Sequence, residues 1–116
     1  MEPNKRIELI KKFFEEECLP LLDTKGHDYT QGSNDANSNF KTGAKRLHKR
    51  GIDEIDVWAI YFGKHMDAIE TWLNDRAVKS EPIKSRIADA VNYLLILHTL
   101  IVERENMSRG MADPLA

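Results

Sequence analysis

The most apolar segment of the chain, residues 81–106, carries hydrophobic residues at helical spacing and so predicts a long helix. Four polar residues interrupt its apolar surface: Arg86, Asp89, Asn92 and Tyr93. The first, second and fourth share one stripe, because positions three and four apart are neighbours on a helix. Burying an unpaired charge costs several kcal/mol. These groups must therefore either pair with one another inside the fold or line a binding site.

Three more helices are predicted from the same spacing, over residues 3–22, 34–50 and 53–78. We expect Pro20 to end or kink the first helix. Asn34 and Asp35 are candidate caps of the second helix, Gly51 ends it, and Asp53 caps the third. No segment shows a convincing strand alternation. The sequence therefore predicts an all-α, four-helix fold with the last two helices as its central hairpin.

The predicted ends of the last helix follow from two residues at its start and a patternless tail. Ser80 is its expected N-cap, and Pro82 suits its first turn. At 116 residues the chain has room for one core. We expect a single helical domain over residues 1–106 and a C-terminal tail over residues 107–116.

Composition limits the classes of partner. The net charge of −2 gives no global basic surface, so we expect no binding to duplex nucleic acid. The longest uninterrupted apolar run, residues 93–97, is too short to cross a bilayer. A lone Cys18 cannot form an internal disulfide and lies on an apolar helix face, which fits a core residue in a reducing cytosol. We expect a cytoplasmic protein without a membrane partner.

The predicted loop between the first two helices covers residues 23–33 and contains a polar run at residues 25–33, Lys-Gly-His-Asp-Tyr-Thr-Gln-Gly-Ser. Its two glycines would let backbone N–H groups face an anion. Lys64 and His65 fall within an aromatic helix face that includes Trp58 and Trp72. Cations beside aromatic rings suit a ligand with a phosphate and a base.

The leading interpretation is a nucleotide held between helices. The candidate ligand-binding residues are Lys25, His27, Lys64, His65 and Arg86 for phosphates, Tyr29 and Tyr93 for the base or sugar, and Asp28, Asn39, Asp89 and Asn92 for hydroxyl and base hydrogen bonds. The alternative is structural: an Arg86–Asp89 pair inside the fold, an ordinary surface loop, and tryptophans that fill the core. The spacing of known zinc and calcium motifs is absent from the sequence.

The segment Arg86-Ile-Ala-Asp-Ala-Val-Asn-Tyr-Leu-Leu95 resembles the final core helix of the MazG-like, all-α nucleoside triphosphate pyrophosphatases. The wider pattern (the run that begins at Lys25, then Asn39-Phe40, then Lys64-His65, then Ser80-Glu-Pro-Ile83) is similar to small phage and prophage proteins grouped as nucleotide-modification-associated, or DUF1599-like. The resemblance implies a MazG-like bundle and a phage setting. Long helices with apolar surface on more than one side lead us to expect a homo-oligomer.

In the MazG-like enzymes, acidic residues of two helices hold magnesium on the phosphates. Only Asp89 matches that pattern here, because Arg86 stands where a second acid is expected. Cations in place of acids favour binding over cleavage. The resemblance thus points to a protein that sequesters a nucleotide or cyclic nucleotide signal of host immunity, with no metal cofactor. The alternatives are a Mg-dependent pyrophosphatase and a protein–protein interaction module. The acids of the pyrophosphatase would be Asp28, Glu70, Glu81 and Asp89.

Overall fold

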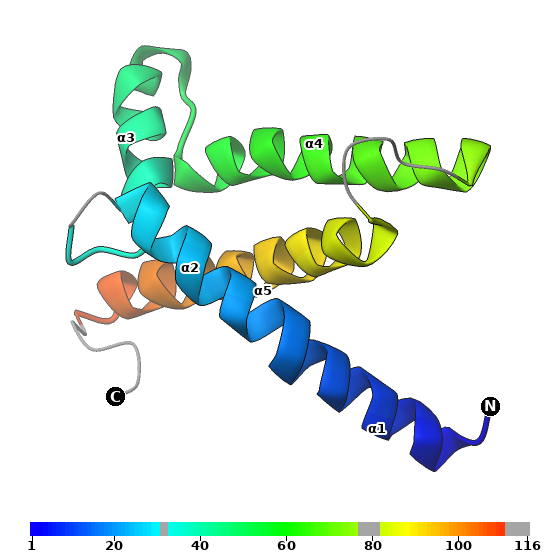
Figure 1. The fold of residues 1–116 in the computed structure, drawn as a ribbon. Coiled ribbons are helices and arrows are strands. Elements are labelled where there is room, and N and C mark those ends of the chain that lie inside the picture. The colour runs from blue at the N-terminus through cyan, green and yellow to red at the C-terminus, as the bar shows by residue number, and fades with distance from the viewer. Residues whose placement is uncertain (31–32, 77–81, 111–116) are drawn as a thin grey trace.

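The computed structural model describes residues 1–30, 33–76 and 82–110, apart from the side chains of residues 27–29. Its α-helices are α1 (Pro3–Phe13), α2 (Leu19–Thr30), α3 (Ser38–Arg46), α4 (Glu54–Asp75) and α5 (Ile83–Ser108). A π-helical turn, Phe14–Cys18, joins α1 to α2, and a 3-10 turn, His48–Arg50, follows α3. The described residues contain no strand, which confirms the all-α prediction. Because α1 runs into α2, the helices form four rods (Figure 1).

The first rod stays helical through Pro20, so of the two predicted effects of this proline the end of the helix is wrong, and the irregularity near Cys18 takes the form of a π turn. Proline lacks the N–H that would bond four residues back, and its ring crowds that carbonyl. The π turn just before it widens the helix, and the N–H of Leu19 bonds to the carbonyl of Phe14, five residues back. Such turns absorb local irregularities within a helix. The wider turn lets the rod continue to Thr30.

The predicted loop at residues 23–33 is also wrong over most of its length, because α2 extends to Thr30. Gly26 costs a helix only about 1 kcal/mol relative to alanine. That cost is outweighed because α2 packs against α5 and α3. Gly26 therefore lies inside a helix instead of presenting N–H groups to an anion, and Gly32 lies outside the described residues.

The second predicted helix begins four residues late. Asp35 Oδ1 accepts a hydrogen bond of 2.9 Å from the N–H of Asn37, which fixes a turn before the helix. Asn37 is the N-cap of α3, in place of the predicted Asn34 or Asp35. The segment ends at Gly51, whose φ of 71° is left-handed, as predicted.

The starts of α4 and α5 differ in their capping. Asp53 caps α4 as predicted, and its Oδ1 accepts a 2.8 Å hydrogen bond from the N–H of Asp56 while Asp56 Oδ2 accepts one from the N–H of Asp53. Pro82 is the N-cap residue of α5 and not part of its first turn, and the predicted cap Ser80 lies outside the described residues. The helix runs to Ser108, two residues into the predicted tail.

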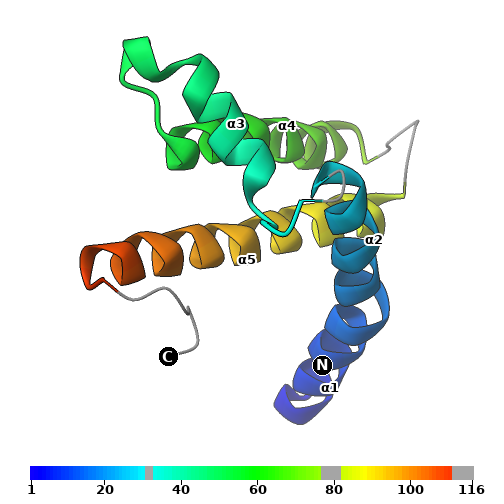
Figure 2. The same cartoon turned by 90° about the vertical axis from the view of Figure 1, so that its left-hand side faces the viewer.

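The core lies where α3 packs on the hairpin of α4 and α5. Its buried residues are Phe40, Val57, Trp58 and Leu100. Trp58 Nε1 donates a 2.7 Å hydrogen bond to the carbonyl of Tyr93, which ties α4 to α5. The two long helices run antiparallel, with α3 crossing one end (Figure 2). This arrangement confirms the predicted central hairpin and the prediction of Trp58 as a core residue.

Two glycines within helices have different surroundings. A Cβ on Gly43 would lie 3.0 Å from Val57 Cγ1, so this glycine permits the close approach of α3 to α4. A Cβ on Gly63 would meet no described atom within 4 Å. Gly63 therefore does not serve a close approach within the described part of the chain.

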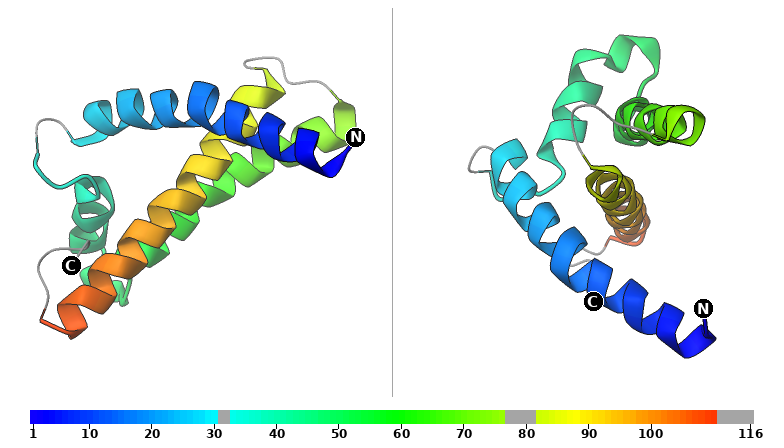
Figure 3. Two further views of the ribbon diagram at one scale, coloured as in Figure 1. Left: turned by 90° about the horizontal axis from the view of Figure 1, so that it is seen from below. Right: turned by 45° about the vertical axis from the view of Figure 1, so that its right-hand side comes forward.

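The N-terminal rod crosses α5 and touches it through few residues. Cys18 is fully buried at the crossing, as predicted, and Asn92 Nδ2 donates a 2.9 Å hydrogen bond to its carbonyl. Burial raises the pKa of the Cys18 thiol, and the charge of Glu17 raises it further. Beyond the crossing, α1 extends away from the body of the molecule (Figure 3).

Helix α5 is long and apolar enough to span a membrane when length and composition alone are considered. The core helix of a soluble protein passes the same test. The apolar run considered in the sequence, residues 93–97, is therefore only part of a longer apolar segment.

Candidate functional site

A cleft of about 420 Å³ lies between α2, the turn before α3, and α5. Its lining residues are Leu21, Leu22, Asp23, Lys25, Gly26, Thr30, Ser33, Asn34, Ala36, Asn37, Asn39, Phe40, Asp89, Asn92, Tyr93, Ile96 and Thr99. The volume lies within the range of about 300–1,000 Å³ that is usual for small-molecule sites. The cleft is thus the natural place to test the predicted ligand-binding residues.

One part of the cleft is aromatic and aliphatic. Phe40 and Tyr93 meet edge to face, with ring centroids 6.2 Å apart and an interplanar angle of 87°. Leu22 and Ile96 also line the cleft. Phe40 belongs to the core, so this wall is held by the main packing of the protein. A rigid apolar wall of this kind can accommodate the flat face of a base.

Four asparagines bring amide groups into the same cleft: Asn34, Asn37, Asn39 and Asn92. Asn92 is 4% exposed, and its Nδ2 is used by the carbonyl of Cys18. Its Oδ1 is buried with no hydrogen-bond partner in the part of the chain that the structure describes. Buried acceptors are nearly always satisfied, so this oxygen is an exception within the described residues.

An ion pair joins the two helices that flank the cleft. Lys25 Nζ on α2 lies 2.7 Å from Asp89 Oδ1 on α5. The Asp89 side chain is 8% exposed and that of Lys25 is 39% exposed. The carboxylate is therefore held inside the fold while the ammonium group reaches solvent. Lys25 is a partner of Asp89 that the sequence pattern did not suggest, in addition to the predicted candidate Arg86 one turn earlier on α5.

His65 packs behind Tyr93, with ring centroids 4.3 Å apart. Burial lowers the pKa of the imidazole. The nearby cations Lys25, Lys64 and Arg86 lower it further, and Asp89 acts in the opposite direction. His65 Nδ1 is buried without a hydrogen-bond partner among the described residues. The neutral form of His65 is favoured in this position.

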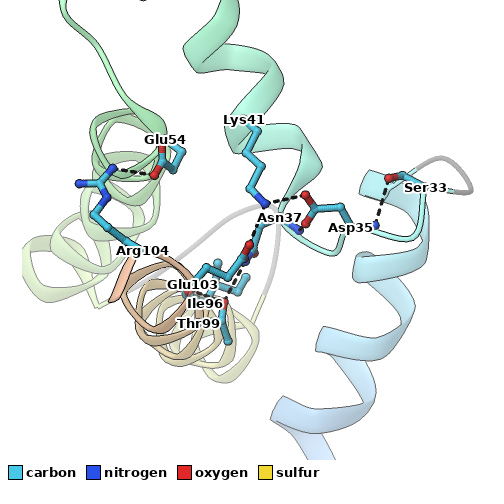
Figure 4. Close-up of polar contacts among 9 residues, drawn as sticks. All are labelled: Ser33, Asp35, Asn37, Lys41, Glu54, Ile96, Thr99, Glu103 and Arg104. Atoms are coloured by element: carbon cyan, nitrogen blue, oxygen red, sulfur yellow. Dashed lines mark hydrogen bonds and ion pairs between the residues drawn. The ribbon is translucent and has the colours of Figure 1, made fainter. Parts of the chain in front are cut away.

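A polar network joins the start of α3 to α5, and two of its members, Asn37 and Thr99, line the cleft (Figure 4). Lys41 Nζ lies 2.6 Å from Asp35 Oδ2 and 2.7 Å from Glu103 Oε2. Asn37 Nδ2 donates to Thr99 Oγ1 at 3.2 Å and also to Glu103 Oε1. Burial opposes the charged form of Lys41, but its bonds to both carboxylates outweigh burial and raise its pKa. This network fixes the start of α3 on α5.

This network is not among the features predicted from the sequence. The sequence does contain its members as two polar pairs spaced by four residues, Asn37 with Lys41 and Thr99 with Glu103. Neither pair stands out alone, because each is an ordinary polar pair on a helix surface. Only the crossing of α3 over α5 brings the two pairs together (Figure 4).

The predicted ligand-binding residues divide into three groups. The first group lines the cleft: Lys25, Asn39, Asp89, Asn92 and Tyr93. The second lies next to it: His65 packs on Tyr93, Arg86 is half-buried one turn before Asp89, and Lys64 is exposed on α4. The third, His27, Asp28 and Tyr29, belongs to α2, but these side chains lie outside the described residues.

The residues named for a magnesium site are dispersed or outside the description. Glu70 is exposed on α4, whereas Asp89 is buried on α5 beside Lys25. Glu81 and the side chain of Asp28 lie outside the described residues. Among the residues that are described, no three His, Cys, Asp or Glu side chains gather in a group able to hold a metal ion.

Comparisons of the chain with protein-family models, with curated proteins and with solved structures find no match.

Proposed function

We propose that this protein binds a nucleotide or cyclic nucleotide in the cleft between α2, α3 and α5 and holds it without cleaving it. The observation that carries the proposal is the lining of the cleft, where the amides of four asparagines and the Lys25–Asp89 pair stand beside the wall of Phe40 and Tyr93. A base offers a flat face that an apolar wall accepts, and its edge groups can bond to the amides.

The charged end of the cleft supports a phosphate as the second part of the ligand. Lys25 lines the cleft with a side chain that is 39% exposed, and its Nζ lies 2.7 Å from Asp89 Oδ1. A phosphate beside Lys25 would form a charge-assisted hydrogen bond. The cations Lys64 and Arg86 lie outside the lining but close enough to lower the pKa of His65, which packs on Tyr93 of the cleft wall.

The remaining parts of the proposal follow from the predicted phage resemblance. In that setting the protein would be cytoplasmic and would sequester an immune signalling nucleotide, a task that needs affinity and not turnover. We also propose that the chain forms a homo-oligomer that completes a MazG-like bundle. A Mg-dependent pyrophosphatase is the alternative that the first experiment must separate from capture.

The test is thermal unfolding with a panel of linear and cyclic nucleotides, each with and without magnesium, followed by heat release and analysis of the ligand. A rise in Tm without magnesium, with the ligand recovered intact, is the expected result. Conversion to a monophosphate only in the presence of magnesium would replace capture by pyrophosphatase activity. No shift with any nucleotide would leave the interaction module as the better description.

A matched pair of variants localises the site. Asn39→Ala removes an amide that lines the cleft and should reduce the ligand-induced shift. Asn74→Ala removes an exposed amide near the end of α4 and should leave the shift unchanged. Equal losses in both variants would place the ligand elsewhere on the molecule.

A further inference from the structure

The outer face of α5 carries an uncovered apolar stripe. Ile87, Leu94 and Ile101 follow one another at intervals of seven, so they lie on one side of the helix. Their exposed fractions are 40%, 53% and 39%. The core residue Leu100 lies on another face of the same helix. Helix α5 is therefore apolar on two sides, and only one of them is covered within the described chain.

A second apolar surface lies on α1, where every residue before Phe13 is exposed. Ile7 and Ile10 are 51% and 59% exposed and lie on one face, which Phe14 continues into the π turn. Figures 1 and 2 both show α1 projecting past α5 on the side away from α4. On α5 the stripe lies across the helix from Asn92, which bonds to the N-terminal rod, so the α1 surface and the α5 stripe are two separate apolar surfaces of one chain.

The chain exposes more surface than a compact monomer of its size. Its accessible area is 8833 Å². A folded monomer of 13.4 kDa is expected to expose about 6,500 Å², which leaves an excess of roughly 2,300 Å². The radius of gyration, 16.4 Å, is also above the approximately 13 Å expected for a compact chain. A stable dimer needs about 800 Å² from each partner, which this excess more than provides.

We infer that a second copy of this chain covers both surfaces, with α1 of each copy lying along the α5 stripe of the other. A two-fold dimer uses the same patch on both subunits, and here each copy offers both an apolar helix and an apolar stripe to receive it. The interval of seven on α5 suits side chains that insert between those of a neighbouring helix. The inference specifies the homo-oligomer of the proposed function and does not depend on the ligand.

The experiment measures the mass of the full chain in solution by light scattering after gel filtration. The wild-type protein should have twice the chain mass of 13.4 kDa. Leu94→Glu and Ile10→Glu should each halve that mass. Leu73→Glu and Ile60→Glu are matched controls on α4, because the exposed fractions are 52% and 60% against 53% for Leu94 and 59% for Ile10. Both controls should remain dimeric.

A monomeric wild-type protein would overturn the inference, as would controls that dissociate as fully as the two test variants. Should Leu94→Glu fail to fold, Ile10→Glu decides, since no residue of α1 is buried and circular dichroism reports its helix content. Lipid is the other candidate that could cover the two apolar surfaces, and flotation with phosphatidylcholine vesicles tests it. A monomeric protein that binds the vesicles would assign these surfaces to lipid. Measuring the nucleotide-induced shift on the same samples separates failure of the interface from failure of the ligand proposal.

Discussion

Replacing either partner of the Lys25–Asp89 pair should have very different effects on stability. Lys25→Met removes the ammonium group and leaves the Asp89 carboxylate, 8% exposed, without the cation 2.7 Å away. Stranding one charge of a buried pair costs about 3–5 kcal/mol. The 39% exposure of Lys25 brings solvent to the pair, so we expect about 2 kcal/mol here.

Asp89→Asn reverses the situation. The Lys25 ammonium group can then be hydrated, so the loss should be about 1 kcal/mol, the value of one hydrogen bond. The double variant has no stranded charge and should also lose only about 1 kcal/mol. The two single effects would then exceed the double effect by about 2 kcal/mol, which is the coupling energy of the pair.

The assay is urea unfolding followed by circular dichroism, at one chain concentration because a dimer makes stability concentration-dependent. The reasoning is refuted if Lys25→Met costs no more than Asp89→Asn, or if the two effects add. Nucleotide binding gives a second reading. Asp89→Asn frees the ammonium group for a phosphate and should increase the ligand-induced shift, whereas Lys25→Met should decrease it.

Three further predictions concern the helices around the site. Gly63→Ala should raise the free energy of unfolding by up to about 1 kcal/mol, because its Cβ meets open space and alanine favours the helix. Gly43→Ala should lower it by about 1 kcal/mol, since overpacking against the buried, stiff Val57 exceeds the gain in helix propensity; urea unfolding measures both, and effects of equal sign would contradict the packing described here. Because burial lowers the pKa of His65 in the folded state, its contribution to stability is complete above the unfolded pKa near 6.5 and is lost as pH falls through the folded pKa. His65→Gln should remove that part of the acid sensitivity, and an unchanged slope of stability against pH would refute the assignment.

Much of the fold could be predicted from the sequence because the core helices are amphipathic and capped by standard residues. The helical spacing of apolar residues over 53–78, which includes Trp58, and over 81–106 identifies the hairpin, and Asp53 and Gly51 mark real boundaries. The N-terminal rod could not be predicted in this way. Pro20 and Gly26 are both signals of a helix end. The helix continues past Pro20 because a π turn precedes it, and past Gly26 because α2 packs on α5, and neither feature can be read from the local sequence.

The cleft could be predicted only in part. Asp89 and Asn92 stand out because they are polar on an apolar helix, and the structure places both in the cleft with Lys25. The contact of Lys25 with Asp89 could not be predicted. It depends on how α2 crosses α5, and the pattern of a single helix contains no information on that crossing.

The N-terminal rod is the wall of the cleft that is held least by apolar packing. Along the described part of this rod, Cys18 is the one buried side chain, and the contacts that fix it on α5 are largely polar, from Asn92 to the Cys18 carbonyl and from Lys25 to Asp89. A ligand that bridges α2 and α5 would add to these few contacts, so it would favour the docked rod more than any other part of the fold. The same rod carries α1 and its apolar face. Occupation of the cleft and burial of the α1 surface are therefore linked through one rigid element, and each must strengthen the other by the same free energy.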